Sequence, residues 1–230
     1  MKTLGLIGGT TWVSTLDYYR HINKEVNNLL SGHNSAKLVL YSFNFQELVS
    51  LQDKNDYEGF KGLLLNAAKA LSHGGIDGIM LCANTLHKYA DAVEEAAGIP
   101  LIHIADETAS EIKKSGFKTV GLLGTKTTMG EAFYKDKLRD HGITAIVPGE
   151  REQEYIHRAI FDELGKDIFK DDTRQELLRI MQDLQKRGAE GIILGCTEIP
   201  LIIKPEHTSI PMFDTLVIHA GAGARFVVSH

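Results

Sequence analysis

The sequence predicts an α/β protein in which two similar halves each carry a parallel sheet. Short aliphatic runs alternate with longer stretches whose apolar residues have helical spacing. Glycines such as Gly116, Gly142 and Gly188 stand where a helix would end before the next strand. Similar segments also recur in the two halves of the chain. Strands and helices that take turns in this way are typical of βα units and parallel sheets.

Each strand is expected where a short aliphatic run lies between turn residues, and each helix where apolar residues recur at intervals of three and four. The expected strands are Leu4–Ile7, Lys37–Tyr41, Gly78–Leu81, Leu101–Ile104, Val120–Leu123, Thr144–Val147, Gly191–Leu194 and Met212–Phe213. The expected helices are Thr15–Leu30, Tyr57–His73, Lys88–Ala97, Asp106–Ser115, Gly130–His141, Glu150–Leu164, Thr173–Arg187 and Thr215–Val228.

Three pairs of matching segments indicate an internal repeat. The pairs keep their order along the chain, and their offset changes by only a few residues, as insertions in loops would produce. They are Gly75–Thr85 with Gly188–Glu198 (188 − 75 = 113), Leu4–Gly8 with Val120–Gly124 (124 − 8 = 116), and Ile99–Ile102 with Ile210–Phe213 (210 − 99 = 111).

The repeat predicts two pseudo-symmetric, flavodoxin-like halves of about four strands each. Residues 1–98 are expected to form the first half and residues 99–213 the second. The final helix, residues 214–230, is expected to cross back and complete the first half. The alternative interpretation is that α/β proteins reuse Gly-hydrophobic-Gly patterns without any duplication.

Composition excludes several classes of protein. The chain has 230 residues, 43% of them hydrophobic and 24% charged, which is enough to bury a sizeable core and excludes a disordered or fibrous protein. The net charge of −5 and the absence of basic clusters argue against a nucleic-acid or membrane-surface partner. A small molecule is therefore the expected partner.

The lengths of the apolar segments and the number of cysteines predict the cellular compartment of the protein. No run reaches the roughly 18 apolar residues of a membrane-spanning helix. Cys82 and Cys196 are too few for a disulfide framework or a cysteine-rich metal site. We therefore expect a soluble, cytoplasmic protein with reduced thiols.

Polar and glycine-rich turns follow four of the expected strands. Ligands of parallel sheets bind beyond the carboxyl ends of the strands, where loops lead into helices. If the halves face one another, these turns meet in a cleft between them, and we expect the active site there. The four turns are Gly8–Thr11, Cys82–Thr85, Gly124–Thr128 and Gly195–Glu198.

Two of these turns have the composition of an anion site. Gly8–Thr11 and Gly124–Thr128 offer backbone N–H groups, hydroxyls and a following helix N-terminus, which suit a carboxylate or phosphate. Neither turn matches a dinucleotide fingerprint or a P-loop. Taken singly, either could be only a tight turn; at matching positions in a repeat, the two favour a small anionic ligand.

Cys196 is the strongest candidate for chemistry. It lies one residue beyond an expected strand, where a helix N-terminus would stabilise a thiolate that acts as base or nucleophile. A buried cysteine that only packs is the alternative. The internal repeat pairs Cys196 with Ala83 rather than with Cys82. Because side chains alternate along a strand, Cys82 is expected to point in a different direction, unless the chain kinks.

Several other polar residues have two interpretations. His87 and His219 follow turns and could meet an acidic ligand, but a solvated position near a helix end is the commoner role. Asn44 and Gln52 could contribute amide donors. Lys166 could close over the ligand as a mobile cation, and an ordinary surface lysine is the alternative.

Four motifs together resemble the aspartate/glutamate racemase family of cofactor-independent amino-acid racemases. The similarity extends through essentially the whole chain. The resemblance implies two α/β halves, a homodimer, no cofactor or metal, and transfer of a proton at the α-carbon between two opposed cysteines. The motifs are Gly8–Thr15, Cys82–His87, Gly195–Ile199 and Phe213–Thr215.

The sequence departs from the family pattern at one of the two catalytic positions. Cys196 matches the cysteine that precedes Thr-Glu, but Ala83 stands immediately before Asn84, where a second acid-base residue is expected. Some relatives carry threonine there, whereas alanine removes the group. Either Cys82 is recruited, or water or another residue protonates that face, or racemase activity is weak or one-directional.

The resemblance also assigns substrate contacts to individual positions. Lys166 matches a lysine that closes over the side-chain carboxylate of the substrate in some relatives. Thr10–Thr11 departs from the more usual Met-Ser of the first loop. The matching contact residues are Thr10, Gln52, Asn84, Thr85, Thr125 and Thr197.

Three functions remain open at this point. The first is a racemase of aspartate, glutamate or a related amino acid. The second is a decarboxylase or isomerase of dicarboxylic acids with a single thiol, which Ala83 favours. The third is a binding protein that has kept the anion site and lost turnover.

Overall fold

The computed structural model describes residues 1–229, and the chain divides into two compact units. The first unit contains Met1–His103 and the chain from His219 onward; the second contains Ile104–Ile218. Within residues 1–229, no helix has both the length and the apolar composition needed to span a membrane.

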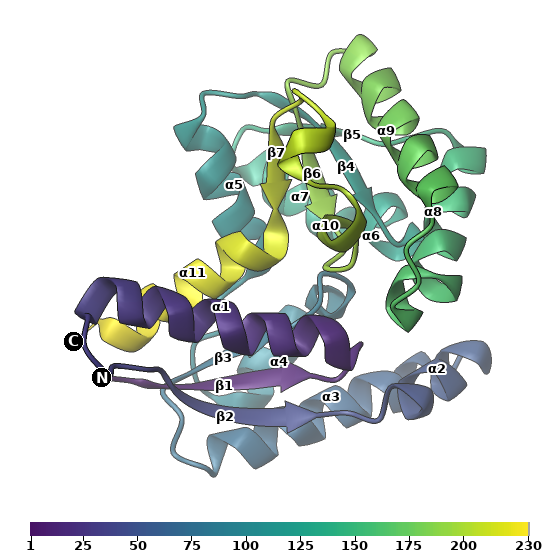
Figure 1. The fold of residues 1–230 in the computed structure, drawn as a ribbon. Helices are drawn as coiled ribbons and strands as arrows, with labels where there is room; N and C mark the ends of the chain where they lie inside the picture. The colour runs from purple at the N-terminus through teal and green to yellow at the C-terminus, as the bar shows by residue number, and fades with distance from the viewer. Residues whose placement is uncertain (230) are drawn as a thin grey trace. The chain divides into compact units, whose positions relative to one another are not determined.

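The first unit is built on a three-stranded parallel sheet of order β2-β1-β3 (Figure 1). The sheet contains β1 (Thr3–Gly8), β2 (Lys37–Ser42) and β3 (Gly78–Leu81). Its helices are α1 (Trp12–Leu30), α2 (Phe45–Asp53), α3 (Tyr57–Ser72), the 3₁₀ helix η1 (Thr85–Tyr89) and α4 (Ala90–Ala97). The last helix of the chain, α11 (Thr215–Val228), enters this unit at His219.

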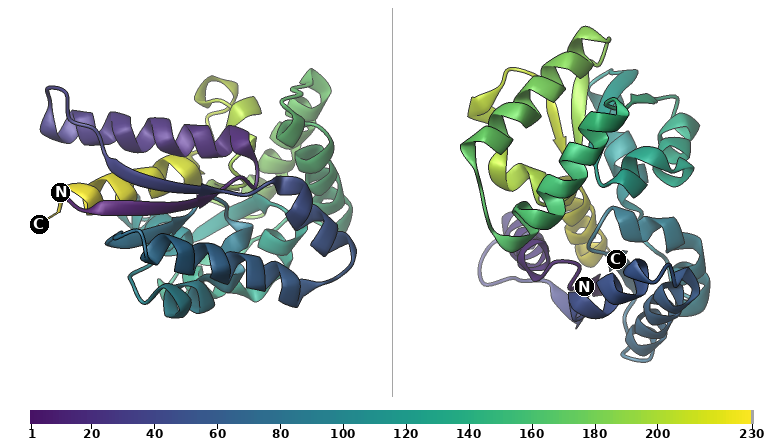
Figure 2. Two further views of the ribbon diagram at one scale, coloured as in Figure 1. Left: turned by 90° about the horizontal axis from the view of Figure 1, so that it is seen from below. Right: turned by 90° about the vertical axis from the view of Figure 1, so that its right-hand side faces the viewer.

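Helices cover both faces of this sheet (Figures 1 and 2). On one face, α11 packs so closely that a Cβ atom on Gly223 would fall 2.5 Å from the sulfur of Met80 and 3.0 Å from Leu4. On the other face, the side chain of Leu71 in α3 lies against Gly5 of β1. The sheet therefore forms the middle layer of an α/β/α sandwich, as parallel sheets usually do.

The second unit is built on a four-stranded parallel sheet of order β5-β4-β6-β7. The strands are β4 (Thr119–Gly124), β5 (Thr144–Ile146), β6 (Gly191–Gly195) and β7 (Met212–Asp214). The helices are α5 (Ile104–Lys114), α6 (Lys126–Gly130), α7 (Ala132–Asp140), α8 (Glu150–Asp162), η2 (Leu164–Lys166), α9 (Asp171–Lys186), α10 (Ile199–Ile202) and η3 (Pro205–His207).

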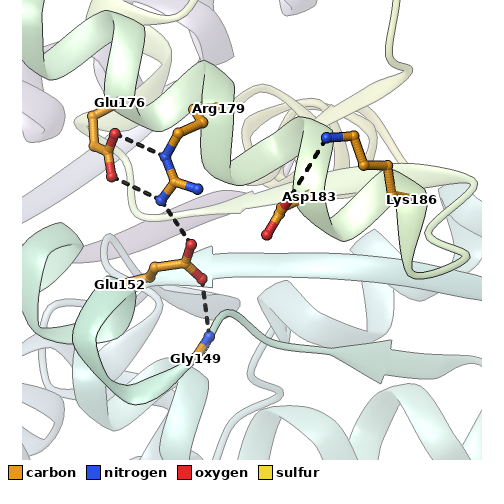
Figure 3. Close-up of polar contacts among 6 residues, drawn as sticks. All are labelled: Gly149, Glu152, Glu176, Arg179, Asp183 and Lys186. Carbon is orange, nitrogen blue, oxygen red and sulfur yellow. Dashed lines mark hydrogen bonds and ion pairs between the residues drawn. The ribbon is translucent and has the colours of Figure 1, made fainter.

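A polar network connects α8 and α9 on the surface of the second unit (Figure 3). The guanidinium of Arg179 donates to Glu176 at 2.8 and 2.9 Å within α9, and to Glu152 of α8 at 2.7 Å. Glu152 in turn accepts the backbone N–H of Gly149 at 3.1 Å and so caps the start of α8. Because these groups are partly exposed, the network contributes more to the alignment of the helices than to stability.

Two parallel sheets with surrounding helices confirm the predicted fold class, and the first three strands of each sheet have the same order. One predicted strand is wrong. Over Leu101–Ile104 only a single bridge forms, between Ile79 and Leu101, and α5 already begins at Ile104. The apolar run is divided between the bridge and the first turn of a helix, so the first sheet has three strands instead of about four.

Several helical segments also differ from prediction. The expected helix over Lys88–Ala97 is preceded by η1, and α4 begins at Ala90. The expected helix Gly130–His141 corresponds to α7, which begins only at Ala132 because Glu131 takes an extended conformation, and the short helix α6 before it was not predicted. The short helices α10 and η3 contain Pro200 and Pro205 in their first turns and were not predicted.

Candidate functional site

Two predicted turns of the first unit lie side by side at one edge of its sheet. β1 and β3 are neighbours, with Ile7 opposite Leu81 in the register. The backbone N–H of Cys82 donates to the carbonyl of Ile7 at 2.8 Å, which extends the pairing to the end of both strands. The turn after β1 and the turn after β3 therefore leave the sheet together, as predicted for a ligand site.

The loop after β1 positions Thr10. Gly9 has a φ of +86°, and a Cβ atom there would fall 2.4 Å from backbone atoms of Phe43, so only glycine fits. Thr11 caps α1 by accepting the N–H of Ser14 at 3.4 Å. Within residues 1–229, the Oγ1 atom of Thr10 is buried and has no hydrogen-bond partner. Such an oxygen has an unsatisfied capacity to bind a ligand.

The turn after β3 contains a buried thiol, Cys82, followed by Ala83, which has no ionisable group. Cys82 is completely buried, and this burial raises the pKa of its thiol well above the usual value. Ala83 is half-buried, packs against the apolar core, and has no group that can transfer a proton. Asn84 is buried and Thr85 half-buried. Cys82 is thus a protonated core thiol at neutral pH, and a catalytic role for it stays a prediction.

His87 is buried, so its interpretation as a solvated cap is wrong. Its Nδ1–H donates to the carbonyl of Ala83 at 2.9 Å and fixes the backbone of the turn. Its ring lies 4.7 Å from that of His103 and 5.4 Å from that of His219, measured between centroids. Burial, followed by the two neighbouring histidines, holds the pKa of His87 well below its usual value.

His219 is also completely buried and joins three elements of the first unit. Its Nε2–H donates to the carbonyl of Ile102 at 2.8 Å, which leaves Nδ1 to accept the hydroxyl of Tyr18 at 2.9 Å. Burial lowers the pKa of His219 to about 3. The ring is therefore neutral and structural, which also corrects its interpretation as a solvated residue.

The second unit repeats the arrangement of neighbouring turns. β4 and β6 pair through Gly124 and Gly195, so the turns that follow them start side by side. Thr125 is buried and caps α6, since its Oγ1 accepts the N–H of Thr128 at 3.2 Å. A Cβ atom on Gly124 would fall 2.7 Å from the carbonyl oxygen of Gly195, so glycine allows the close approach.

Cys196 forms a buried acid-base pair with Glu198. The thiol of Cys196 donates to Oε2 of Glu198 at 2.9 Å, and the hydroxyl of Thr197 donates to the same oxygen at 3.0 Å. All three side chains are buried. Burial first, and then the neighbouring carboxylate, raises the pKa of Cys196 well above its usual value.

The expected helix N-terminus is weaker than predicted. α10 begins only at Ile199 and has four residues, although the N–H groups of Glu198 and Ile199 do favour the thiolate of Cys196. Burial and the carboxylate outweigh them. The hydrogen bond to Glu198 and the raised pKa favour the thiol form of Cys196 in the resting protein.

Two predicted contact residues lie away from these turns. Gln52 is exposed on the last turn of α2. Lys166 is exposed in η2, with its Nζ 4.0 Å from a carboxylate oxygen of Asp162. The structure groups Thr10 with Cys82–Thr85, and Thr125 with Cys196–Thr197, but it places Gln52 and Lys166 on other segments of their units.

Glu198 and His103 are two candidate functional residues that the sequence patterns did not single out. The available signal for Glu198 was its position two residues after the cysteine, in a turn that allows the two side chains to meet. His103 gave no local signal, because its contact with His87 depends on the fold. Among residues 1–229, no group of three His, Cys, Asp or Glu side chains is arranged to hold a metal ion.

Comparisons with known proteins place this geometry in context. The profile of the Asp/Glu/Hydantoin racemase family matches residues 7–223. The chain is 46% identical to the structure of a putative Asp/Glu racemase from Yersinia pestis, with all of both chains covered and a TM-score of 0.92. An aspartate racemase homologue from Pyrococcus horikoshii OT3 is 38% identical, again over all of both chains, with a TM-score of 0.84.

A curated relative adds a protein with a described activity. The broad specificity amino-acid racemase RacX of Bacillus subtilis (strain 168) is 28% identical over 167 residues, which are 70% of this chain and 69% of RacX. This chain belongs to the Asp/Glu/hydantoin racemase family.

Proposed function

We propose that this protein is an amino-acid racemase that acts on aspartate, glutamate or a related amino acid. The family match and the racemases among its relatives support an isomerase that inverts an α-carbon. Such a reaction removes the α-proton from one face and returns a proton to the other. The α-proton is weakly acidic, so the protein must stabilise a carbanion-like state and hold an acid-base group against it.

The observation that carries the proposal is the buried pair of Cys196 and Glu198. The thiol enters the reaction with its proton and can donate it to the α-carbon as the carbanion-like state collapses. The S–H bond then breaks as the C–H bond forms, which leaves a thiolate. The N–H groups of Glu198 and Ile199 favour this thiolate, which is the form that removes an α-proton when the reaction runs in the opposite direction.

Ala83 makes the two faces of the α-carbon unequal in this proposal. Cys196 serves one face of the α-carbon, and a group other than Ala83 must serve the other. Cys82 is one candidate, but its complete burial and raised pKa oppose the role. Water or another side chain is the alternative. We therefore expect the rate of Cα-proton exchange from the L enantiomer to differ from the rate of exchange from the D enantiomer.

The substrate carboxylate and amine are proposed to bind at the turns that follow the strands. The unpartnered hydroxyl of Thr10 supports this assignment in the first unit. In the second unit, Thr197 supports the same assignment, because its hydroxyl orients the carboxylate of Glu198. Gln52 and Lys166 are proposed as outer contacts that approach the substrate from exposed positions. The full set of proposed contacts is Thr10, Gln52, Asn84, Thr85, Thr125, Lys166 and Thr197.

Ala83 favours a second candidate function, a decarboxylase or isomerase of dicarboxylic acids. Ala83 removes an acid-base group, and a decarboxylase or isomerase of dicarboxylic acids needs only one thiol to deliver a proton. A screen of substituted malonates and of maleate separates this function from racemisation. Turnover of either class without loss of the Cα proton from amino acids would favour the second function.

The proposed racemase needs no cofactor and works as a cytoplasmic homodimer.

The proposed reaction is tested by proton NMR of L- and D-aspartate and of L- and D-glutamate in deuterated water. We expect loss of the Cα proton signal with the wild-type protein, unaffected by prior treatment with a metal chelator or with hydroxylamine. Binding of aspartate without any exchange would select a binding protein instead.

A further inference from the structure

An exposed apolar surface lies on α1 and β2 of the first unit. In α1 the exposed fractions are 66% for Trp12, 56% for Leu16 and 54% for Tyr19. In β2 they are 36% for Val39, 44% for Leu40 and 37% for Tyr41. We call these six residues the α1–β2 surface. Soluble monomers rarely expose so many large apolar side chains together.

The apolar stripe of α1 continues onto β2 at Leu40, whereas Val39 and Tyr41 lie on the opposite face of the same edge strand. Trp12, Leu16 and Tyr19 are four and three residues apart, so they share one face of α1. Asn23 continues the same face, and its side chain accepts the backbone N–H of Ala36 at 2.9 Å, just before β2 begins. The apolar stripe of α1 therefore lies on the side of the helix that is next to the segment before β2.

The register places Leu40 on the face of the sheet that α1 covers. Leu6 is the partner of Leu40, and Leu4, two residues before it, faces α11. α1 lies on the same face as α11, since Tyr18 hydrogen-bonds to His219. The exposed part of Leu40 thus extends the stripe of α1 around the edge of the sheet.

β2 is an unprotected edge strand. Among residues 1–229 it pairs only with β1, and nearly all of its residues are exposed. Phe43, just after the strand, directs its N–H to Gly8 of β1 at 3.0 Å. Because backbone groups alternate along a strand, Leu38, Leu40 and Ser42 direct theirs away from the sheet. Proteins usually block such an edge with charges, proline or a bulge, and β2 has only Lys37 at its start.

We propose that the α1–β2 surface is the interface between two copies of this chain, with β2 pairing antiparallel to β2 of the second copy. This inference rests on the homodimer of the proposed function and says where its interface lies. A two-fold axis at Leu40 places each Leu40 opposite its copy, Leu38 opposite Ser42, and Val39 opposite Tyr41. All outward backbone groups of the strand are then paired, and no like charges meet.

The size of the surface fits a second copy of the chain. With about 150–250 Å² for each large side chain, the exposed fractions amount to roughly 600 Å² of apolar surface. A stable interface buries about 800 Å² per partner, a value that the backbone of β2 and the flanking polar residues complete. A two-fold interface also requires a patch that is complementary to itself, which antiparallel pairing of one strand with its copy provides.

The test is the mass in solution of the wild type and two variants, measured by light scattering at micromolar concentration. We expect the wild type at twice the 25.4 kDa of the chain. Leu40→Lys places two charges against each other at the axis and should give a monomer. The matched control is Tyr57→Lys, an equally exposed residue of α3 outside the surface, which should stay dimeric.

A second variant keeps the test decisive if Leu40→Lys does not fold. Leu40→Cys should form a disulfide-linked dimer on mild oxidation, whereas Tyr57→Cys should not; the native thiols of Cys82 and Cys196 are buried. A Leu40→Lys dimer, or a Leu40→Cys protein that stays uncrosslinked, would overturn the interface but not the homodimer. A monomeric wild type would overturn both, and the reaction would still be tested separately by exchange.

Discussion

The thiol of Cys196 and the carboxylate of Glu198 lie 2.9 Å apart in a buried turn, and the thiol donates the hydrogen bond. The hydroxyl of Thr197 donates to the same carboxylate oxygen at 3.0 Å. The carboxylate and burial together keep the pKa of Cys196 high. A cysteine held in this state is a proton donor first and becomes a base only after it has given up its proton.

The charge of Glu198 should set the pH at which Cys196 ionises. Glu198→Gln keeps the size and a hydrogen-bond acceptor but removes the charge that raises the pKa of the thiol. We expect thiolate formation, followed by ultraviolet absorbance or alkylation rate, to move to lower pH. Cys196→Ser is the control for signal from Cys82. An unchanged ionisation profile in Glu198→Gln would contradict the role given to the carboxylate.

Restoring an acid-base group at Ala83 should even out the rates of Cα-proton exchange from the two enantiomers. Ala83→Cys places a thiol at the position that the internal repeat pairs with Cys196. A positioned acid or base contributes on the order of 10²–10⁴-fold, so the slower enantiomer should gain about 10²-fold or more in rate. Cys82→Ala in the wild-type background is the companion variant.

The outcomes of these two variants separate the candidates for the second face. If Cys82 serves that face, Cys82→Ala abolishes exchange from one enantiomer and Ala83→Cys adds little. If water or another group serves it, Cys82→Ala leaves exchange nearly intact. The buried position of Cys82 leads us to expect the second result.

The unpartnered hydroxyl of Thr10 should bind substrate rather than support the fold. Thr10→Val keeps the shape and removes an oxygen that has no hydrogen-bond partner among residues 1–229. The free energy of unfolding should stay the same or rise, because an unsatisfied buried oxygen is lost. Loss of one hydrogen bond worth about 1–1.5 kcal/mol should raise KM about tenfold. A destabilised variant with unchanged KM would show that Thr10 serves the fold.

The buried histidines should make the protein less stable in mild acid. The pKa of His219 is lowered to about 3 and that of His87 is also lowered, so the folded state keeps both rings neutral. The unfolded chain takes up their protons below about pH 6.5. Their contribution to stability is therefore complete above about pH 6.5 and is lost as the pH falls toward 3.

Denaturant titrations over this pH range measure the effect. Each histidine should reduce the free energy of unfolding by up to about 1.4 kcal/mol per pH unit. In His219→Gln, the slope of the free energy of unfolding against pH should fall by the contribution of one histidine. Replacement of the exposed His33 by Gln is the control and should leave this slope unchanged. Equal slopes in the wild type and His219→Gln would contradict the neutral, buried state of the ring.

Local patterns predicted most of the fold, because strands and helices in βα units have clear periodicity. β3 and α11 have the predicted bounds. The strand prediction at Leu101–Ile104 was wrong because a segment of four residues with only three aliphatic side chains suits a strand bridge and the first turn of a helix equally well. Short runs of this kind are assigned by their tertiary neighbours, which the sequence does not display.

The candidate site was predictable in its positions but not in its protonation. The spacing of Cys196 after a strand located the thiol, and the repeat identified Ala83 as its counterpart. The state of the thiol depends on where the Glu198 carboxylate turns and on burial, both of which arise only in the folded chain. His87 illustrates the same limit, since its neighbours His103 and His219 are distant in sequence.

Exchange of the Cα proton in Cys196→Ala tests the central claim most directly. Proton NMR of L- and D-aspartate and glutamate in deuterated water should show exchange with the wild type. Cys196→Ala should lose at least about 10²-fold in rate, as expected for removal of a positioned acid-base group. Exchange by Cys196→Ala at the wild-type rate would contradict the assignment of Cys196 as the proton-transferring residue.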